Sequence, residues 1–74
     1  MSLFTEELTK AMPAALQVAQ DLGVSIYGAS LALSIVAAEV EANPAITAAE
    51  IERKRGMTPE AVKACLKAME AHND

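Results

Sequence analysis

The sequence has few of the residues that form disulfides, metal sites or large aromatic cores. Among its 74 residues are no tryptophan, one tyrosine, one phenylalanine, one cysteine and one histidine. One cysteine excludes an internal disulfide, and one cysteine with one histidine falls short of a zinc site. Because 53% of the residues are hydrophobic, the core must consist of Ala, Val, Ile, Leu and Met. We expect a reduced, cytosolic protein that holds no metal and no cofactor.

The short length indicates a single domain over residues 1–74. A chain of this size buries only roughly 60–65% of the surface that it exposes when unfolded. Alanine-rich helices bury little apolar area each, and each Å² of buried apolar surface stabilises the folded state by only about 25 cal/mol. We therefore expect the monomer to be marginally stable, and we expect the chain to gain stability by forming a homodimer.

Signals for secretion and for a membrane span are also missing. The start MSLFTEEL lacks a basic region followed by an apolar stretch. Residues 22–38 carry no charge over 17 positions, which is near the lower limit for a spanning helix. However, two glycines and three serines interrupt this stretch, and no lysine or arginine flanks it. We expect a helix buried on nearly all sides within the protein, and no contact with a membrane.

Helical periodicity accounts for nearly the whole sequence, and no stretch shows the alternation or the hairpin turns of strands. Pro13 leaves two alternatives for the first helix, which is either kinked there or begins there. Ser25 can cap the second helix, and Pro44 ends it by pushing Asn43 out of the helical region. The predicted helices span 5–22, 25–42, 48–55 and 59–72. The predicted fold class is all-α: an N-terminal helix (1–24), then a three-helix core made of a central apolar helix (25–43) and a helix–turn–helix (47–72).

The first two predicted helices carry most of the apolar surface. In the second, Leu31, Ile35 and Ala38 widen the apolar face well beyond one stripe, as is typical of a bundle centre or a dimer interface. Ser30 and Ser34, one turn apart, either let another helix approach closely or form the one solvated edge. The first helix serves the dimer interface or the core. The residues that we expect at the dimer interface are Leu8, Met12, Leu22, Ile26, Leu33 and Val36.

The stretch ITAAEIERKRGMTPEAV has the local signals of two helices joined by a short turn. Thr47 and Glu50 have the spacing of a capping box, in which each side chain satisfies a free backbone N–H. Gly56 can adopt the left-handed conformation that ends a helix. Thr58 can cap the next helix, with Pro59 at its first position, where a missing N–H costs nothing. The sequence thus predicts a helix–turn–helix, which reads DNA in some proteins and only packs in others.

Positive charge is concentrated on this helix–turn–helix, although the net charge of the chain is −4. Residues 53–67 hold five basic residues and one glutamate, or 5 − 1 = +4, while residues 1–46 hold one lysine and five carboxylates, or 1 − 5 = −4. Such a cluster suits contacts with phosphates. It also has an ordinary explanation, because Arg53, Lys54 and Arg55 complement the negative end of a helix. Lys63 and Lys67 likewise fit a solvated helical face.

The segment LSIVAAEVEANPAITAAEIERKRGMTPEAVKACLKAMEA, residues 33–71, resembles the three-helix DNA-binding core of winged-helix regulators of the multiple-antibiotic-resistance repressor type. The resemblance implies that the last helix enters a major groove as a recognition helix. It also implies that Ile51, Met57, Val62 and Cys65 or Leu66 lock the two helices together. The residues that we expect at the DNA are Arg53, Lys54, Arg55, Thr58, Glu60, Lys63, Ala64 and Lys67.

Three features depart from that family. Glu52 stands where the family has alanine, and Arg55 stands where it has a buried leucine. The sequence ends at Asp74, where a β-hairpin wing follows in the family. The resemblance implies a DNA-binding domain that lacks the wing, whereas Glu52, Arg55 and the missing wing favour a protein-interaction module.

Two functions remain open from the sequence, and an enzyme is not among them. The first is a homodimeric transcriptional regulator that binds duplex DNA. The second is a small helical protein-interaction module without DNA binding. We do not expect catalysis, because Cys65 lies on an apolar stripe, His72 lies near the end of the last helix, and no carboxylate pair converges on one helical face.

Overall fold

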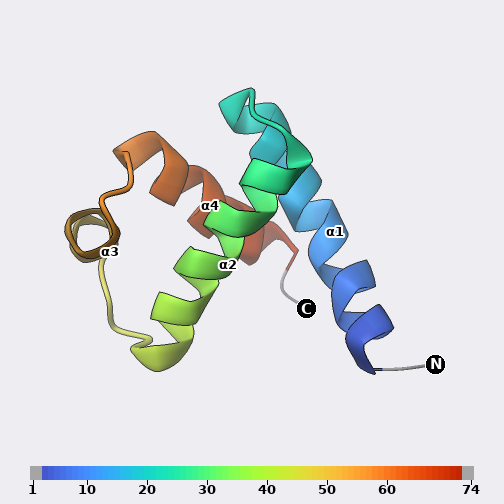
Figure 1. Cartoon of the computed structure of the whole chain (residues 1–74). Helices are drawn as coiled ribbons and strands as arrows, with labels where there is room; N and C mark the ends of the chain where they lie inside the picture. Colours follow the sequence, from blue (N-terminus) through green and yellow to red (C-terminus); the bar gives the residue numbers. More distant parts are fainter. Residues whose placement is uncertain (1–2, 73–74) are drawn as a thin grey trace.

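The structure, a computed structural model, describes the backbone of residues 3–72 and the side chains of residues 12–72. Over these residues it contains four α-helices and no strand, so the all-α prediction is confirmed. The helices are α1 (Leu3–Leu22), α2 (Ile26–Ala42), α3 (Ala48–Arg55) and α4 (Pro59–Ala71). In Figure 1, α1 and α2 descend from a shared upper corner, α4 passes behind α2 and ends toward α1, and α3 lies on the side of α2 away from α1.

Local residues set both ends of α2, as the sequence predicts. The Ser25 hydroxyl accepts a hydrogen bond from the Gly28 backbone N–H at 3.1 Å, which satisfies a free donor of the first turn. At the other end Asn43 is extended, with φ −147° and ψ 91°, as expected for the residue before proline. Both predicted boundaries are confirmed to within one residue.

The first helix runs through Pro13 and does not begin there. α1 starts at Leu3, two residues before the predicted position, and Pro13 lies inside it with its side chain exposed. The alternative in which the helix starts at Pro13 is therefore wrong. Gly23, at φ 66°, then leads the chain out of α1 and toward the Ser25 cap.

The core is small and rich in alanine, as the composition predicts. α4 is its central element because it packs against α1, α2 and α3. Most side chains of the core are short, and five of its eleven members are alanines. The buried hydrophobic residues are Ala14, Ala15, Val18, Ala29, Leu33, Val36, Ile51, Val62, Ala64, Cys65 and Ala68.

The central helix is less buried than the sequence predicts. α2 turns Ala29, Leu33 and Val36 into the core but leaves Leu31 and Ile35 exposed. The expectation of burial on nearly all sides is therefore wrong. Its cause is physical: three neighbouring helices contribute too little surface to surround a helix of 17 residues.

The expected dimer interface needs a corresponding correction. Leu33 and Val36 are 8% and 0% exposed within one copy of the chain, so they cannot also face a second copy. Leu22 is half-buried against the same core, whereas Met12 and Ile26 are exposed. The side chain of Leu8 lies outside the described residues.

Among the described residues, no single helix has both the length and the apolar character needed to cross a membrane. Within the same residues, one pair of helical segments is long and apolar enough when the two are taken together: Met12–Leu22 and Ile26–Ala42. The chain bends by 110° at the break between them.

Candidate nucleic-acid interface

The start of α3 is fixed by a reciprocal capping box. The Glu50 backbone N–H donates to Thr47 Oγ1 at 3.2 Å, and the Thr47 backbone N–H donates to Glu50 Oε1 at 3.1 Å. Hydrogen bonds from the Thr47 backbone and hydroxyl lower the pKa of Glu50 from its ordinary value of 4.5. Two backbone donors of the first turn are thus satisfied, as the T-x-x-E spacing predicts.

The turn between α3 and α4 depends on a left-handed glycine. Gly56 has φ 65° and ψ 32°, and its N–H donates to the Glu52 carbonyl. The Met57 N–H donates to the same carbonyl at 3.2 Å. These bonds close the last turn of α3 and send the chain away from its axis. Thr58 then caps α4 by accepting from the Ala61 N–H at 3.2 Å, and Pro59 occupies the first turn.

Apolar side chains hold α3 against α4. Ile51, Val62 and Cys65 are fully buried, and Met57 and Leu66 pack against them from partly buried positions. These are the residues that the sequence places at the contact between the two helices. Burial raises the pKa of the Cys65 thiol, which favours its neutral form. Cys65 therefore serves the packing of the core.

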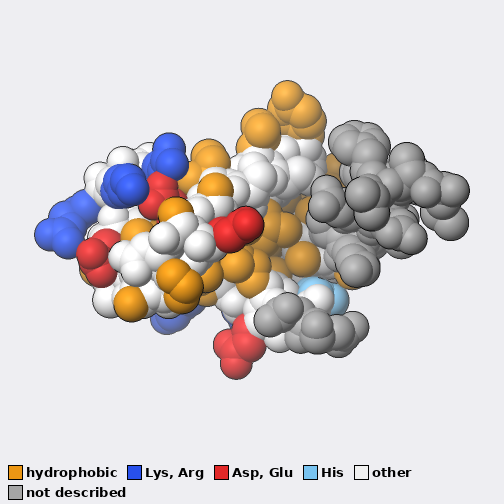
Figure 2. All heavy atoms as spheres, turned by 90° about the horizontal axis from the view of Figure 1, so that it is seen from below, with side chains coloured by type: hydrophobic (Ala, Val, Ile, Leu, Met, Phe, Trp, Pro, Cys, Tyr) orange, Lys and Arg blue, Asp and Glu red, His pale blue; other side chains and the backbone are white. Residues whose placement is uncertain are grey.

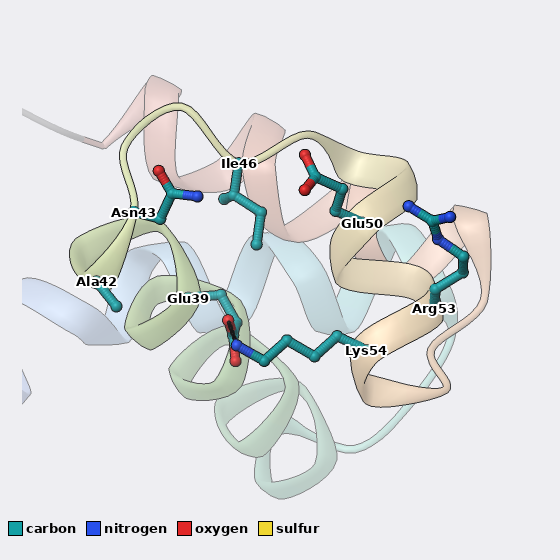
Figure 3. A pocket seen from close by; sticks show the side chains of 7 residues that line it. All are labelled: Glu39, Ala42, Asn43, Ile46, Glu50, Arg53 and Lys54. Atoms are coloured by element: carbon teal, nitrogen blue, oxygen red, sulfur yellow. Dashed lines mark hydrogen bonds and ion pairs between the residues drawn. The ribbon is translucent and has the colours of Figure 1, made fainter.

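A buried carboxylate on α2 binds two of the expected DNA-contacting cations. Glu39 is 4% exposed. Its Oε1 accepts a hydrogen bond from Lys54 Nζ at 2.9 Å, and its Oε2 accepts one from Arg55 Nε at 2.6 Å. The hydrogen bonds from Lys54 and then Arg55 lower the pKa of Glu39 below 4.5, in spite of an opposing effect of burial. Figure 3 shows the Lys54 side chain reaching across from α3 to the Glu39 carboxylate.

Sequence reasoning missed this ion pair, although a signal was present. Glu39 lies three residues after Val36, on the same face of α2 that enters the core. A carboxylate on a buried face requires a cation nearby, because an unpaired charge there is costly. The nearest cations in sequence are those at the end of α3. Arg55 thus has its partner within the fold.

Beside this ion pair, a shallow pocket separates the end of α2 from α3. Its polar lining has both signs of charge, with Glu39 and Glu50 facing Arg53 and Lys54 (Figure 3). Ala42, Asn43 and Ile46 complete it. Among the described residues, no group of three or more histidine, cysteine or carboxylate side chains is placed to hold a metal ion.

The remaining basic residues of α3 and α4 are free on the surface. Arg53, Lys63 and Lys67 are exposed, and none of them forms an ion pair within the described part of the chain. Lys54 and Arg55 keep 63% and 45% of their side chains exposed although they bind Glu39. In Figure 2 the Lys and Arg side chains gather mainly at the end of the molecule where Figure 1 places α3.

The exposed face of α4 carries both signs of charge. Lys63 and Lys67 share it with Glu60 and Glu70, so the four side chains sum to 2 − 2 = 0. Thr58 is exposed at the start of this face. Ala64, expected at the DNA, is instead 7% exposed and belongs to the core. It lies one residue after Lys63, which places it about 100° around the helix from that side chain.

His72 joins the C-terminal end of α4 to α1. Its Nε2 lies 2.8 Å from Gln17 Oε1, which connects the C-terminal cap of α4 to α1. No local sequence pattern indicates this contact, because 55 residues separate the two side chains. His72 remains exposed on the surface.

Comparison of the chain with protein-family models, with curated proteins and with solved structures gives no match.

Proposed function

We propose that this chain binds duplex DNA through the helix–turn–helix of α3 and α4. One observation supports it most directly: Lys63 and Lys67 stand one turn apart on the exposed face of α4, directly after a turn closed by Gly56. In this arrangement α4 is the recognition helix, and Arg53 at the end of α3 adds a third free cation. Regulation of transcription is the role that fits such a domain.

Phosphates are the main target of this surface. Lysine binds phosphate as a point charge, and the exposed face of α4 offers no arginine, asparagine or glutamine for bidentate reading of bases. Glu60 and Glu70 on the same face oppose the approach of a phosphate backbone. The expected binding is therefore weak, low in sequence specificity and sensitive to salt.

The number of free cations sets the expected salt dependence. Three phosphate contacts per chain, from Arg53, Lys63 and Lys67, correspond to a slope of about −2.7 in a plot of log K against log salt concentration. Between about 50 and 200 mM salt the affinity then falls roughly 40-fold. Fluorescence anisotropy with a labelled duplex measures this slope. An affinity that does not change with salt would contradict the proposal.

A second candidate function is a protein-interaction module that does not bind DNA. The zero net charge of the exposed α4 face favours it, because general DNA binding depends on excess positive charge. Folded protein without measurable DNA affinity at low salt would select this function. A pool of random duplexes, presented at two salt concentrations, provides the same test for any binding sequence.

A further inference from the structure

We infer that the outward face of α2 is a self-association surface that packs against the same face of a second copy of the chain. We define the outward α2 face by five exposed residues: Tyr27, Leu31, Ser34, Ile35 and Ala38. It lies opposite the side of α2 that carries Ala29, Leu33 and Val36 into the core. It therefore differs from the dimer interface expected from the sequence.

The outward α2 face exposes large apolar side chains at helical spacing. Tyr27 is 74% exposed, Leu31 51% and Ile35 37%, and the three follow one another at intervals of four residues. Positions 27, 31, 34 and 38 also follow the 4-3-4 spacing with which one helix packs against another. Nothing within the described part of the chain covers these side chains.

The two serine hydroxyls of this region permit its dehydration. The hydroxyl of Ser30, at its edge, donates to the Ile26 carbonyl at 2.8 Å, and the hydroxyl of Ser34 donates to the Leu31 carbonyl at 2.8 Å. Both donors are therefore satisfied before any partner arrives, and burying them leaves no unpaired N–H or O–H. Ser34 and Ala38 are also small, which lets a second helix come close.

The distribution of charge indicates that the partner is another copy. Two-fold association places a surface against itself, so any net charge on the surface repels its own counterpart. The chain has a net charge of −4, yet residues 22–38 carry none. The next carboxylate, Glu39, is buried and paired with Lys54 and Arg55. The outward α2 face also lacks the charges that would select an acidic or basic partner.

The size of the core argues in the same direction. Five of the eleven buried hydrophobic residues are alanines, so one copy buries little apolar area. A standard interface covers about 800 Å² on each partner, roughly 15% of the 5207 Å² surface of this chain. A helix of 17 residues is about 25 Å long and supplies the central strip of such an interface. Dimerisation adds the apolar burial that a single copy lacks.

Light scattering coupled to size exclusion tests the association. The wild-type chain is expected at 2 × 7.8 = 15.6 kDa, and Leu31→Lys is expected at 7.8 kDa with unchanged helical circular dichroism. Leu16→Lys is the matched control, since Leu16 is 47% exposed on α1 against 51% for Leu31. This control should remain dimeric. A wild-type chain that is still monomeric at about 1 mM would overturn the inference.

Cross-linking tests the two-fold contact itself. In a Cys65→Ala background, Ser34→Cys should form a disulfide-linked dimer on oxidation, whereas Gln20→Cys, exposed on α1, should not. The reverse pattern, or a dimer that Leu16→Lys alone dissociates, would move the interface to α1 and refute the assignment. Neither measurement involves DNA. Failure of the proposed DNA binding would therefore leave this result unchanged, and failure of dimerisation would leave the anisotropy result unchanged.

Discussion

At the scale of single residues, Gly56 determines where α4 points. Its φ of 65° lies in the region that glycine adopts freely and that β-branched residues resist. A Cβ atom at this position would meet no atom within 4 Å, so only the backbone conformation opposes a side chain there. The direction of α4, and with it the placement of Lys63, depends on this conformation.

Gly56→Val should therefore lower the free energy of unfolding by more than about 1 kcal/mol. Urea denaturation followed by circular dichroism measures the change. Gly28→Ala is the matched control, and it should change the free energy of unfolding in the opposite direction. Gly28 lies inside α2, where a Cβ atom would stand 3.5 Å from Ser25 Oγ, and alanine there should stabilise by roughly 0.5–1 kcal/mol. Equal effects of the two substitutions would contradict the left-handed turn.

Glu39 makes a second prediction at this scale, on the pH dependence of stability. Its pKa is lowered by hydrogen bonds from Lys54 and Arg55, so the ionised carboxylate stabilises the folded state. This contribution is complete above its ordinary value of 4.5 and is lost as pH falls through the lower folded value. Glu39→Gln should be less stable than wild type near neutral pH, with a gap that narrows in acid.

Urea midpoints of wild type and Glu39→Gln, taken at several pH values from neutral to strongly acidic, measure this difference in stability. Glu41→Gln is the control, because Glu41 is exposed on the same helix and forms no ion pair within the described residues. A constant gap between wild type and Glu39→Gln at all pH values would refute the buried ion pair. If Lys54 and Arg55 also reach DNA, Glu39→Gln should tighten DNA binding by releasing them.

At the scale of elements, the two faces of α2 have different roles. Leu33 lies in the core and Leu31 on the outward α2 face, two residues further back along the same helix. Leu33→Asp should unfold the chain, because it buries an unpaired charge. The measurement is loss of the helical circular dichroism signal at neutral pH. Leu31→Asp is the control and should keep that signal, so loss of helicity in both variants would contradict the assignment of the two faces.

The caps and turns of these elements could be predicted from sequence because their causes are local. Ser25, Thr47, Gly56 and Thr58 each act on backbone groups within a few residues, and each does so in the structure as predicted. Which side of α2 meets the core could not be predicted. Its apolar residues extend too far around the helix to distinguish a buried face from an exposed one.

The candidate site was predictable only in part, for a similar reason. Lys63 and Lys67 are exposed as expected from the spacing of apolar residues on α4. Ala64 was misplaced because alanine marks neither face of a helix. Glu39 binds Lys54 and Arg55 in tertiary contacts across 15 and 16 residues. A carboxylate on an apolar helix indicates that a cation lies nearby, but the sequence does not show which cation it is.

At the scale of the whole molecule, charge and apolar surface are separated. Among the described residues, the free cations lie on α3 and α4, and the exposed apolar residues Tyr27, Leu31 and Ile35 lie on α2. Residues 1–46 carry a net charge of −4. The proposed DNA-binding surface and the proposed self-association surface thus lie on different helices. Because the net charge of the chain is −4, the proposed DNA binding would depend on the local arrangement on α4 and not on the protein as a whole.

The most direct measurement compares two double variants of the exposed α4 face by fluorescence anisotropy with duplex DNA. Each alters two charges on this face: Lys63→Gln with Lys67→Gln removes the positive pair, and Glu60→Gln with Glu70→Gln removes the negative pair. The first should weaken binding and reduce the salt slope by about 2, and the second should tighten binding. Unchanged binding in both variants, with helicity intact, would contradict recognition of DNA by α4.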